Sequence, residues 1–356
     1  MTAFEIAVLT SAPLFVRIFA APAIGIWSDT RKDHRTALIW GGWIAVVSAI
    51  IFPFANGFWP ILTLIIVFQL ATQSLIPLAE AKSLAGARRL RLDYGRMRLW
   101  GSLAFISANI IGGFVIASYG GDSIAAMMFI TVVAVALAAH ALPDNPGAQH
   151  TTRHGFRTGL SDAKTLLSQK WFLLLLLSAG LIQSSHAVFY VFGALHWRSM
   201  GISDNWIGIL WALGVIVEAG LFSMSNHLVA RIGATGLIII GGIGAVVRWV
   251  IMAFDPAFWA LFPLQCLHAL TFAATHLGTV NLLQTHVSTE RGGAAQSANA
   301  ALGSGVLMGI TTFSAGLLYE TLHAASYAVM ASLAGLGLIS AVFLAVQLQI
   351  APKQAG

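Results

Sequence analysis

Residues 171–195 read WFLLLLLSAGLIQSSHAVFYVFGAL, a stretch of 25 residues that contains no Asp, Glu, Lys or Arg. A helix needs about 20 apolar residues to cross the roughly 30 Å hydrocarbon core of a bilayer, so this stretch is long enough. Its apolar residues follow one another without the alternation that is typical of a barrel strand. The stretch therefore predicts a helix that spans a membrane.

Similar runs occupy most of the 356 residues, of which 58% are hydrophobic and 9% are charged. About a quarter of the residues in soluble domains are charged, so the composition excludes that class and predicts an all-α polytopic membrane protein. The single cysteine, Cys266, excludes a disulfide framework and a cysteine-based metal cluster. Eleven runs are predicted to span the bilayer, approximately Ile6–Trp27, Ala37–Phe54, Pro60–Ala79, Leu99–Tyr119, Ile124–Leu142, Trp171–Leu195, Trp206–Val229, Gly236–Phe254, Phe258–Val280, Ala294–Leu317 and Ala324–Val346.

Basic residues gather in the loops on one side of these runs. Of the 19 Lys and Arg residues, all but three share that side; Arg198 lies on the other side, and Arg17 and Arg248 fall inside runs. Because positive loops face the cytoplasm, we expect Met1 outside and Gly356 inside a cell membrane, as in the bacterial inner membrane. The net charge of +6 is then explained by these loops, and we expect no nucleic acid as a partner.

A long polar connection divides the chain into two parts. We expect a bundle of five spans over residues 1–142, a cytoplasmic linker over residues 143–170 and a bundle of six spans over residues 171–356. The loop at Asp29 matches the loop at Arg231, an offset of about 201 residues, and at this offset the run 171–195 has no partner. Parallel half-repeats of this kind are typical of the major facilitator fold, and the chain resembles that fold with its first span missing.

Two groups of residues carry a resemblance to a known family. Gly25-Ile-Trp-Ser-Asp29 with its basic neighbours resembles the loop motif of the major facilitator superfamily, although the family's usual glycine between the basic residues is absent. The sequence YGRMRLWGS at 94–102, taken with Glu218, Arg248-Trp249 and residues 267–276, resembles the phenylpropionate permease branch, a relative of nucleoside:proton and lactose-type symporters. The resemblance implies proton-coupled uptake, and it assigns to the gating loops Gly25, Asp29, Arg31, Arg35, Arg96 and Arg98.

Three ionisable residues lie inside predicted spans, where a charge is costly unless it faces partners or a wet cavity. Arg17 and Glu218 both lie near the middle of their runs and are repeat equivalents, while Arg248 lies nearer the outer end of its run. We expect Arg17 and Arg248 to bind substrate and Glu218 to carry a proton, because a carboxylate that is partly withdrawn from water beside an arginine can adopt two charge states. The alternative is a set of structural ion pairs that lock helices together.

His268 is the third member of the predicted proton site. Lactose-type symporters combine an acidic residue, an arginine and a histidine on consecutive spans of this half, and the resemblance places His268 in the histidine position. The family's further acidic residue on that span is not present here. A lone buried histidine can also serve as a structural hydrogen-bonding group, and the sequence leaves both readings open.

Other polar side chains recur at helical spacings inside the runs. Each could hydrogen-bond a substrate or hold helices together, the latter being the commoner use of polar groups within bilayers. The candidate substrate-binding residues of this kind are Gln183, His186, Gln69, Gln73, His276, Gln296 and Asn299.

The leading hypothesis is a monomeric secondary transporter that moves a small organic solute, preferably an aromatic or other carboxylate, together with protons by alternating access. A nucleoside or a sugar is the alternative substrate class. A transport-incompetent or sensor-like truncated homologue is the alternative function, suggested by the missing first span. The sequence contains no His-Glu-x-x-His, Gly-x-Ser-x-Gly or P-loop motif, so we expect neither an enzyme nor a cofactor or metal.

Overall fold

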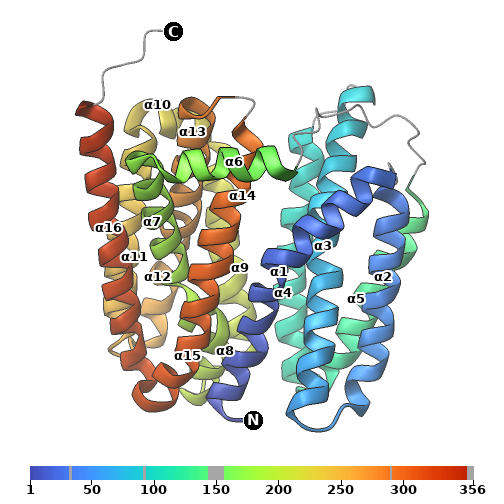
Figure 1. The fold of residues 1–356 in the computed structure, drawn as a ribbon. Coiled ribbons are helices and arrows are strands. Elements are labelled where there is room, and N and C mark those ends of the chain that lie inside the picture. The colour runs from blue at the N-terminus through green and yellow to red at the C-terminus, as the bar shows by residue number, and fades with distance from the viewer. Residues whose placement is uncertain (32–33, 91–93, 143–155, 289–290, 351–356) are drawn as a thin grey trace. The chain divides into compact units, whose positions relative to one another are not determined.

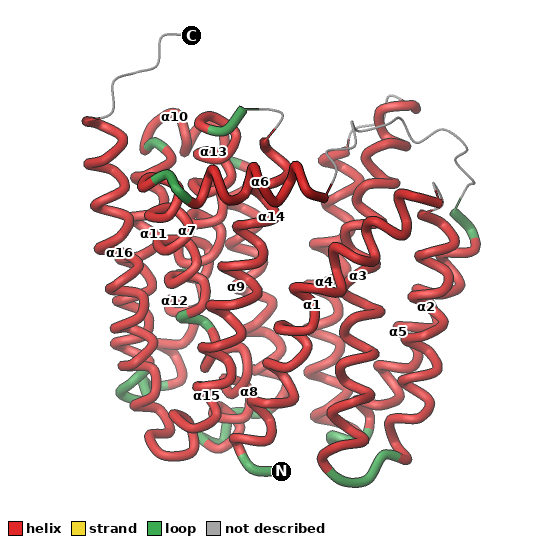
Figure 2. The backbone as a smooth tube through the Cα atoms, in the orientation of Figure 1, coloured by secondary structure: helices red, strands yellow, loops and turns green. Residues whose placement is uncertain are grey.

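The computed structural model describes residues 1–31, 34–90, 94–142, 156–288 and 291–350. Within these ranges the chain forms helices joined by turns, without a strand (Figure 2). Helices satisfy their own backbone hydrogen bonds, as an apolar solvent requires. Ten described stretches are long and apolar enough to cross a bilayer; the last, Gly292–Ile350, turns at His323–Ala325 and so contains the last two predicted runs. The predicted all-helical fold is thereby confirmed.

The chain divides into two compact units, and each is described by itself. The first, called the N-terminal unit, comprises Leu9–Thr152. In it α2 packs against both α3 and α5. Gly42 permits the close crossing with α5, because a Cβ at this position would lie 2.9 Å from the Cα of Ala136. The unit contains most of α1 (Ala3–Arg31), then α2 (His34–Ile51), the turn Phe52–Phe54, α3 (Phe58–Leu90), α4 (Tyr94–Tyr119) and α5 (Ser123–His140).

The C-terminal unit comprises Met1–Val8 and Arg153–Gly356. In it α16 lies beside α7 and α11 (Figure 1). Its helices are α6 (Phe156–Leu167), α7 (Lys170–Ser184), α8 (Ala187–Ser199), α9 (Asp204–Ser223), α10 (Ser225–Ile232), α11 (Ala234–Met252), α12 (Leu261–Cys266), α13 (Thr275–His286), α14 (Gly292–Asn299), α15 (Met308–Leu322) and α16 (Ser326–Ile350), with short 3-10 turns at Phe258–Ala260 and His323–Ala325.

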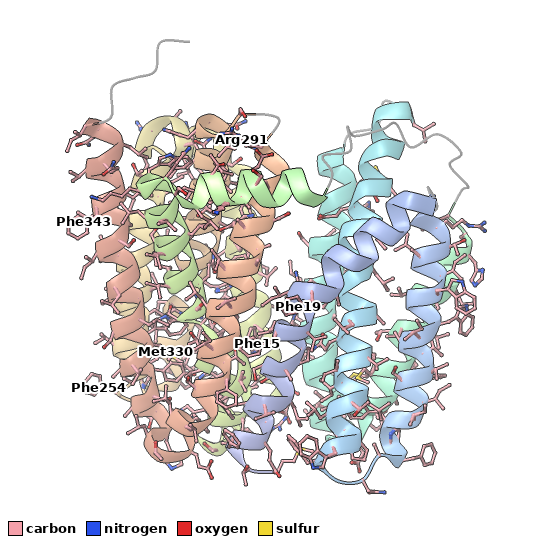
Figure 3. All side chains as sticks on the ribbon, in the orientation of Figure 1. Phe15, Phe19, Phe254, Arg291, Met330 and Phe343 are labelled. Carbon is pink, nitrogen blue, oxygen red and sulfur yellow. The ribbon has the colours of Figure 1, made fainter. Side chains whose placement is uncertain are left out.

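Small residues allow the helices of the C-terminal unit to approach closely, as is common for helices in lipid. A Cβ at Gly337 of α16 would lie 3.1 Å from the backbone nitrogen of Ile182 in α7. A Cβ at Gly316 of α15 would lie 2.5 Å from the Cβ of Ala7, so the start of α1 is held against α15. Many outward-facing side chains are large and apolar: Figure 3 shows Phe254 and Phe343, which are 81% and 61% exposed, pointing away from the helices.

Part of the predicted linker is helical. The sequence indicates a polar connection over residues 143–170, of which residues 143–155 lie outside the described ranges and the helix α6 occupies most of the remainder. An ion pair between Asp162 Oδ1 and Arg291 Nε, 3.3 Å apart, joins α6 to the beginning of α14, where Figure 3 labels Arg291. The linker is therefore held against the C-terminal unit at its helical end.

Four of the predicted spans are interrupted inside the C-terminal unit, and one of them, 206–229, breaks at Met224 between α9 and α10. The run 171–195 breaks between α7 and α8, at Ser185 and His186. A π-helical turn, Ala269–Ala274, separates α12 from α13, and a second, Ala300–Leu307, separates α14 from α15. Breaks and π-helical turns inside helices are frequent at functional sites, because they redirect side chains and free backbone groups. Buried polar side chains meet where the break at Ser185 and His186 faces the π-helical turn Ala269–Ala274.

Candidate functional site

The centre of the site is Arg248 in α11, which is 0% exposed. Its guanidinium carbon lies 4.7 Å from the ring centre of Phe189 in α8 and 4.6 Å from that of Trp249. Aromatic faces stabilise a cation that has left water, and a planar guanidinium stacks on them well. Arg248 is therefore enclosed by the unit and does not reach toward the surface.

Arg248 directs its hydrogen bonds to the segment that surrounds the first π-helical turn. Its Nη2 donates to Gln265 Oε1 at 3.1 Å and its Nη1 donates to His268 Nδ1 at 3.2 Å. A longer contact of 3.5 Å joins Nη1 to Thr271 Oγ1. Because buried charges require such partners, these contacts fix the position of Arg248 against α12.

His268 lies between Arg248 and Glu218. Its Nε2 is 3.4 Å from Oε2 of Glu218, which belongs to α9. The side chains of His268 and Glu218 are 11% and 19% exposed, so the pair lies at the edge of the buried cluster. The structure thus brings together Glu218, Arg248 and His268, the acidic residue, the arginine and the histidine that the sequence analysis assigned to the proton and substrate site of this half.

The break between α7 and α8 adds His186 to the cluster. His186 is fully buried, and its Nε2 lies 2.9 Å from Thr271 Oγ1. Its Nδ1 lies 3.0 Å from the carbonyl oxygen of Gln183 and 3.2 Å from that of Ile182. The side-chain amide of Gln183 donates to the carbonyl oxygen of Phe272 in the π-helical turn at 3.1 Å. Gln183 and His186 therefore connect α7 to the turn that carries Thr271.

The sequence places Tyr190 on one helix face with Gln183 and His186, but Phe189, Trp211 and Trp249 around the cluster were not predicted as site residues. Trp249 Nε1 donates to Ser185 Oγ at 2.8 Å, and the rings of Phe189 and Trp211 stack at 4.6 Å. Tyr190 stacks on His186 at 5.4 Å and is 39% exposed. Inside an apolar run an aromatic residue looks like any other hydrophobic residue, so hydropathy offers no signal.

The remaining predicted binding residues are carried by other helices. Arg17 of α1 and Gln69 and Gln73 of α3 belong to the N-terminal unit and are all half-buried. In the C-terminal unit Gln296 is exposed and Asn299 half-buried, both on α14. His276 at the start of α13 is exposed, and its ring lies parallel to that of Phe272 at 6.2 Å. Their roles, and the matching depth of Arg17 and Glu218, stay predictions.

The predicted gating residues lie at helix ends in the N-terminal unit. Gly25, Asp29 and Arg31 fall in the last turns of α1, and Arg96 and Arg98 fall in the first turns of α4. The side chains of these residues lie outside the described part of the structure. Arg35, at the beginning of α2, donates from Nη2 to the carbonyl oxygen of His140 at 2.9 Å, which joins α2 to the end of α5.

Comparisons with known proteins agree on a transporter. The sequence model of the MFS_1-like family matches residues 1–329. The chain is 32% identical over 299 residues to a probable 3-phenylpropionic acid transporter of Escherichia coli (strain K12), covering 82% of this chain and 77% of that protein. It is 24% identical to a maltose permease of Geobacillus stearothermophilus, over 71% of this chain and 63% of the permease.

Solved structures share the fold at low sequence identity. The nucleoside transporter NupG superposes with a TM-score of 0.80 at 17% identity, covering 99% of this chain and 92% of NupG. A bacterial homologue of the human lysosomal transporter Spinster superposes with a TM-score of 0.70 at 14% identity, covering 99% of this chain and 90% of the homologue. These likenesses establish the architecture of a multi-pass transporter.

Proposed function

Because the chain belongs to the MFS_1-like family of membrane transporters, we propose that it moves a small organic solute across the bilayer together with a proton, which Glu218 carries. The observation that supports this proposal is the contact of Glu218 with His268, which is itself bonded to the buried Arg248. An ionisable side chain inside a membrane span is expensive unless it has partners or reaches water. Glu218 has a partner in His268, and its side chain is 19% exposed.

The directions of the hydrogen bonds favour Glu218 over His268 as the proton carrier. A guanidinium only donates, so His268 Nδ1 must accept from Arg248, and the proton of a neutral imidazole is then on Nε2. This Nε2 lies 3.4 Å from Glu218 Oε2, so its hydrogen is on the side of the ring nearer the carboxylate than Nδ1 is. A second proton on His268 would have to displace Arg248 from Nδ1. An added proton is therefore better placed on the carboxylate.

Two charge states of Glu218 give the site two different contacts. The ionised carboxylate accepts a charge-assisted hydrogen bond from His268, whereas the protonated carboxyl group loses most of that attraction. If the proton or the solute binds one conformation of the transporter more tightly than the other, it shifts the equilibrium between the two conformations by that difference in affinity. In this scheme the proton on Glu218 accompanies the solute through the transport cycle.

An aromatic carboxylate is the solute class that we favour. The support is the likeness to a probable 3-phenylpropionic acid transporter and the presence of Arg17 at the centre of α1, half-buried among apolar residues. A planar guanidinium binds a carboxylate through two parallel hydrogen bonds. Tyr190 beside His186 and His268 offers an aromatic surface to an apolar part of the solute.

The other predicted residues complete the proposal. Gln69, Gln73, His276, Gln296 and Asn299 would provide further polar contacts to the solute, and the loops with Asp29 and Arg96 would control opening. We also propose that the protein acts as a monomer in a bacterial inner membrane, with Met1 outside and Gly356 in the cytoplasm, on the basis of its basic loops.

Uptake into proteoliposomes tests the proposal. We would measure accumulation of radiolabelled 3-phenylpropionate driven by an imposed pH gradient, and counterflow exchange of the same compound without a gradient. Glu218→Gln should abolish accumulation while exchange continues, because the amide keeps the shape of the side chain but releases no proton. The matched control is Glu320→Gln, since Glu320 is an exposed carboxylate on α15. Equal loss of both activities in folded Glu218→Gln protein would contradict the role of Glu218, and transport of uridine but not 3-phenylpropionate would contradict the solute class.

A further inference from the structure

We propose that His276, besides any contact with the solute, receives the proton from Glu218 and passes it to water on the side of the membrane where α9 ends. Both residues lie in the C-terminal unit, Glu218 on α9 and His276 at the beginning of α13. In the proposed orientation this side is the cytoplasm. The inference rests on the proposed function of Glu218 and adds the route by which its proton leaves.

Three parallel rings lead from the proton site to His276. The ring of Phe272 lies 5.3 Å from that of His268 at an interplanar angle of 16°, and 6.2 Å from that of His276 at an angle of 7°. The two nitrogens of an imidazole form hydrogen bonds in the plane of the ring, so in a stack they point to the sides and not at the next ring. Phe272 therefore separates the two histidines, and each exchanges protons at its ring edge.

The helix α9 contacts this stack at both histidines. Glu218 Oε2 lies 3.4 Å from His268 Nε2, and Phe222, one helical turn further along α9, meets the ring of His276 edge-on at 6.2 Å. One turn of α-helix advances the chain by about 5.4 Å, so Glu218 lies about one turn from the level of His276. Glu218 also acts on His276 electrostatically. A proton crosses such a separation through one bridging water or after rotation of either side chain.

Exposure rises along the route from Arg248 to His276. Arg248 is 0% exposed, the side chains of His268 and Glu218 are 11% and 19% exposed, and His276 is exposed. Near His276 the helix α9 ends at Ser223, which is exposed as well. Imidazole is the side-chain group that changes its charge near physiological pH, so at an accessible position it can both accept a proton and release it to water. His276 is therefore suited to connect the half-enclosed Glu218 with the solution.

The step is a proton transfer followed by release. The O–H bond of the protonated Glu218 carboxyl group breaks and an N–H bond forms at the unprotonated ring nitrogen of neutral His276. The products are a carboxylate and an imidazolium ion. The imidazolium ion then gives one proton to water, which restores neutral His276, while the carboxylate again attracts the Nε2–H group of His268. Both groups are thereby returned to their starting state for the next transport cycle.

Comparing net uptake with exchange in proteoliposomes separates proton release from solute binding. Net uptake of 3-phenylpropionate down its own gradient requires the proton to leave the protein in every cycle, whereas counterflow exchange returns the protein with its proton in place. At saturating solute, His276→Ala should slow net uptake about tenfold or more and leave exchange unchanged. Imidazole added to both sides should restore net uptake by His276→Ala, because it supplies the missing base, and should not accelerate wild type.

His227→Ala is the matched control, since His227 is an exposed histidine on α10 of the same unit, and it should transport like wild type. Net uptake by His276→Ala at the wild-type rate would overturn the inference. Equal slowing of net uptake and exchange, or slowing that imidazole does not relieve, would overturn it as well. If His276→Ala does not fold, His276→Gln decides by the same comparison of net uptake with exchange.

A failure of the proposed function gives a different result. If Glu218→Gln still accumulates solute against a gradient, the role of Glu218 is wrong and the inference falls with it. If Glu218→Gln loses accumulation while His276→Ala transports like wild type, the inference alone is wrong. If the protein transports uridine and not 3-phenylpropionate, the same comparison is made with uridine.

Discussion

Replacing Arg248 by lysine preserves the charge but should destabilise the protein. The guanidinium donates to His268 Nδ1 at 3.2 Å and to Gln265 Oε1 at 3.1 Å, and a single ammonium cannot reproduce this fork. Gln265 is 2% exposed, so an unpaired Gln265 oxygen costs about 1–3 kcal/mol. Loss of guanidinium stacking on Phe189 and Trp249 adds about 1 kcal/mol. The expected destabilisation by Arg248→Lys is therefore about 2–4 kcal/mol.

Tryptophan fluorescence during heating of the detergent-solubilised protein measures this change, because the chain contains 11 tryptophans. At about 2 °C per kcal/mol for a chain of this size, the unfolding temperature of Arg248→Lys should fall by roughly 5 °C. Arg231→Lys is the matched control, since Arg231 is exposed at the end of α10 and its replacement should change stability by less than about 0.5 kcal/mol. Equal unfolding temperatures for the two variants would refute the reasoning that the Arg248 fork is required.

Two further substitutions test packing and recognition. Gly278→Ala should destabilise by about 1–3 kcal/mol in the same heating assay, because its Cβ would lie 2.4 Å from the carbonyl oxygen of Ala234. A Cβ at Gly335 on α16 would have no neighbour within 4 Å, so Gly335→Ala should be neutral or slightly stabilising. A lower unfolding temperature for Gly335→Ala than for Gly278→Ala would contradict the close packing of α11 against α13. Arg17→Lys should weaken binding of 3-phenylpropionate but not of its uncharged amide, measured by inhibition of counterflow. If Arg17→Lys and wild type bind the acid equally, Arg17 does not form a bidentate hydrogen-bonded contact with the carboxylate.

The spans could be predicted from the sequence because bilayer thickness fixes the length of an apolar run. The breaks inside four of those runs could not, since a hydropathy pattern distinguishes an unbroken α-helix neither from a π-helical turn nor from a short break. Ser185 and His186 lie in the middle of a run that is apolar on both sides, yet α7 ends and α8 begins there. Tertiary contacts of His186 and Phe272 lie at two of these breaks, and no local pattern records them.

The site was partly visible in the sequence for a physical reason. Glu218, Arg248 and His268 stand out because a titratable or charged group among apolar residues is costly and needs partners. Thr271 does not stand out, because a threonine hydroxyl in a helix usually bonds to its own backbone and carries no sign of a remote partner. The stacking of Phe189 and Trp249 on Arg248 could not be predicted either, since burial and stacking depend on how α8 and α11 pack.

Proton movement accompanying the solute is the central claim, and a pH measurement tests it most directly. 3-Phenylpropionate would be added outside lightly buffered proteoliposomes, with protein-free liposomes correcting for passive entry of the acid. The account predicts that wild-type protein makes the external medium more alkaline as solute enters, and that Glu218→Gln protein does not. Solute entry through wild-type protein without alkalinisation beyond the protein-free control would contradict proton symport. Alkalinisation of equal size with Glu218→Gln would contradict the assignment of the proton to Glu218.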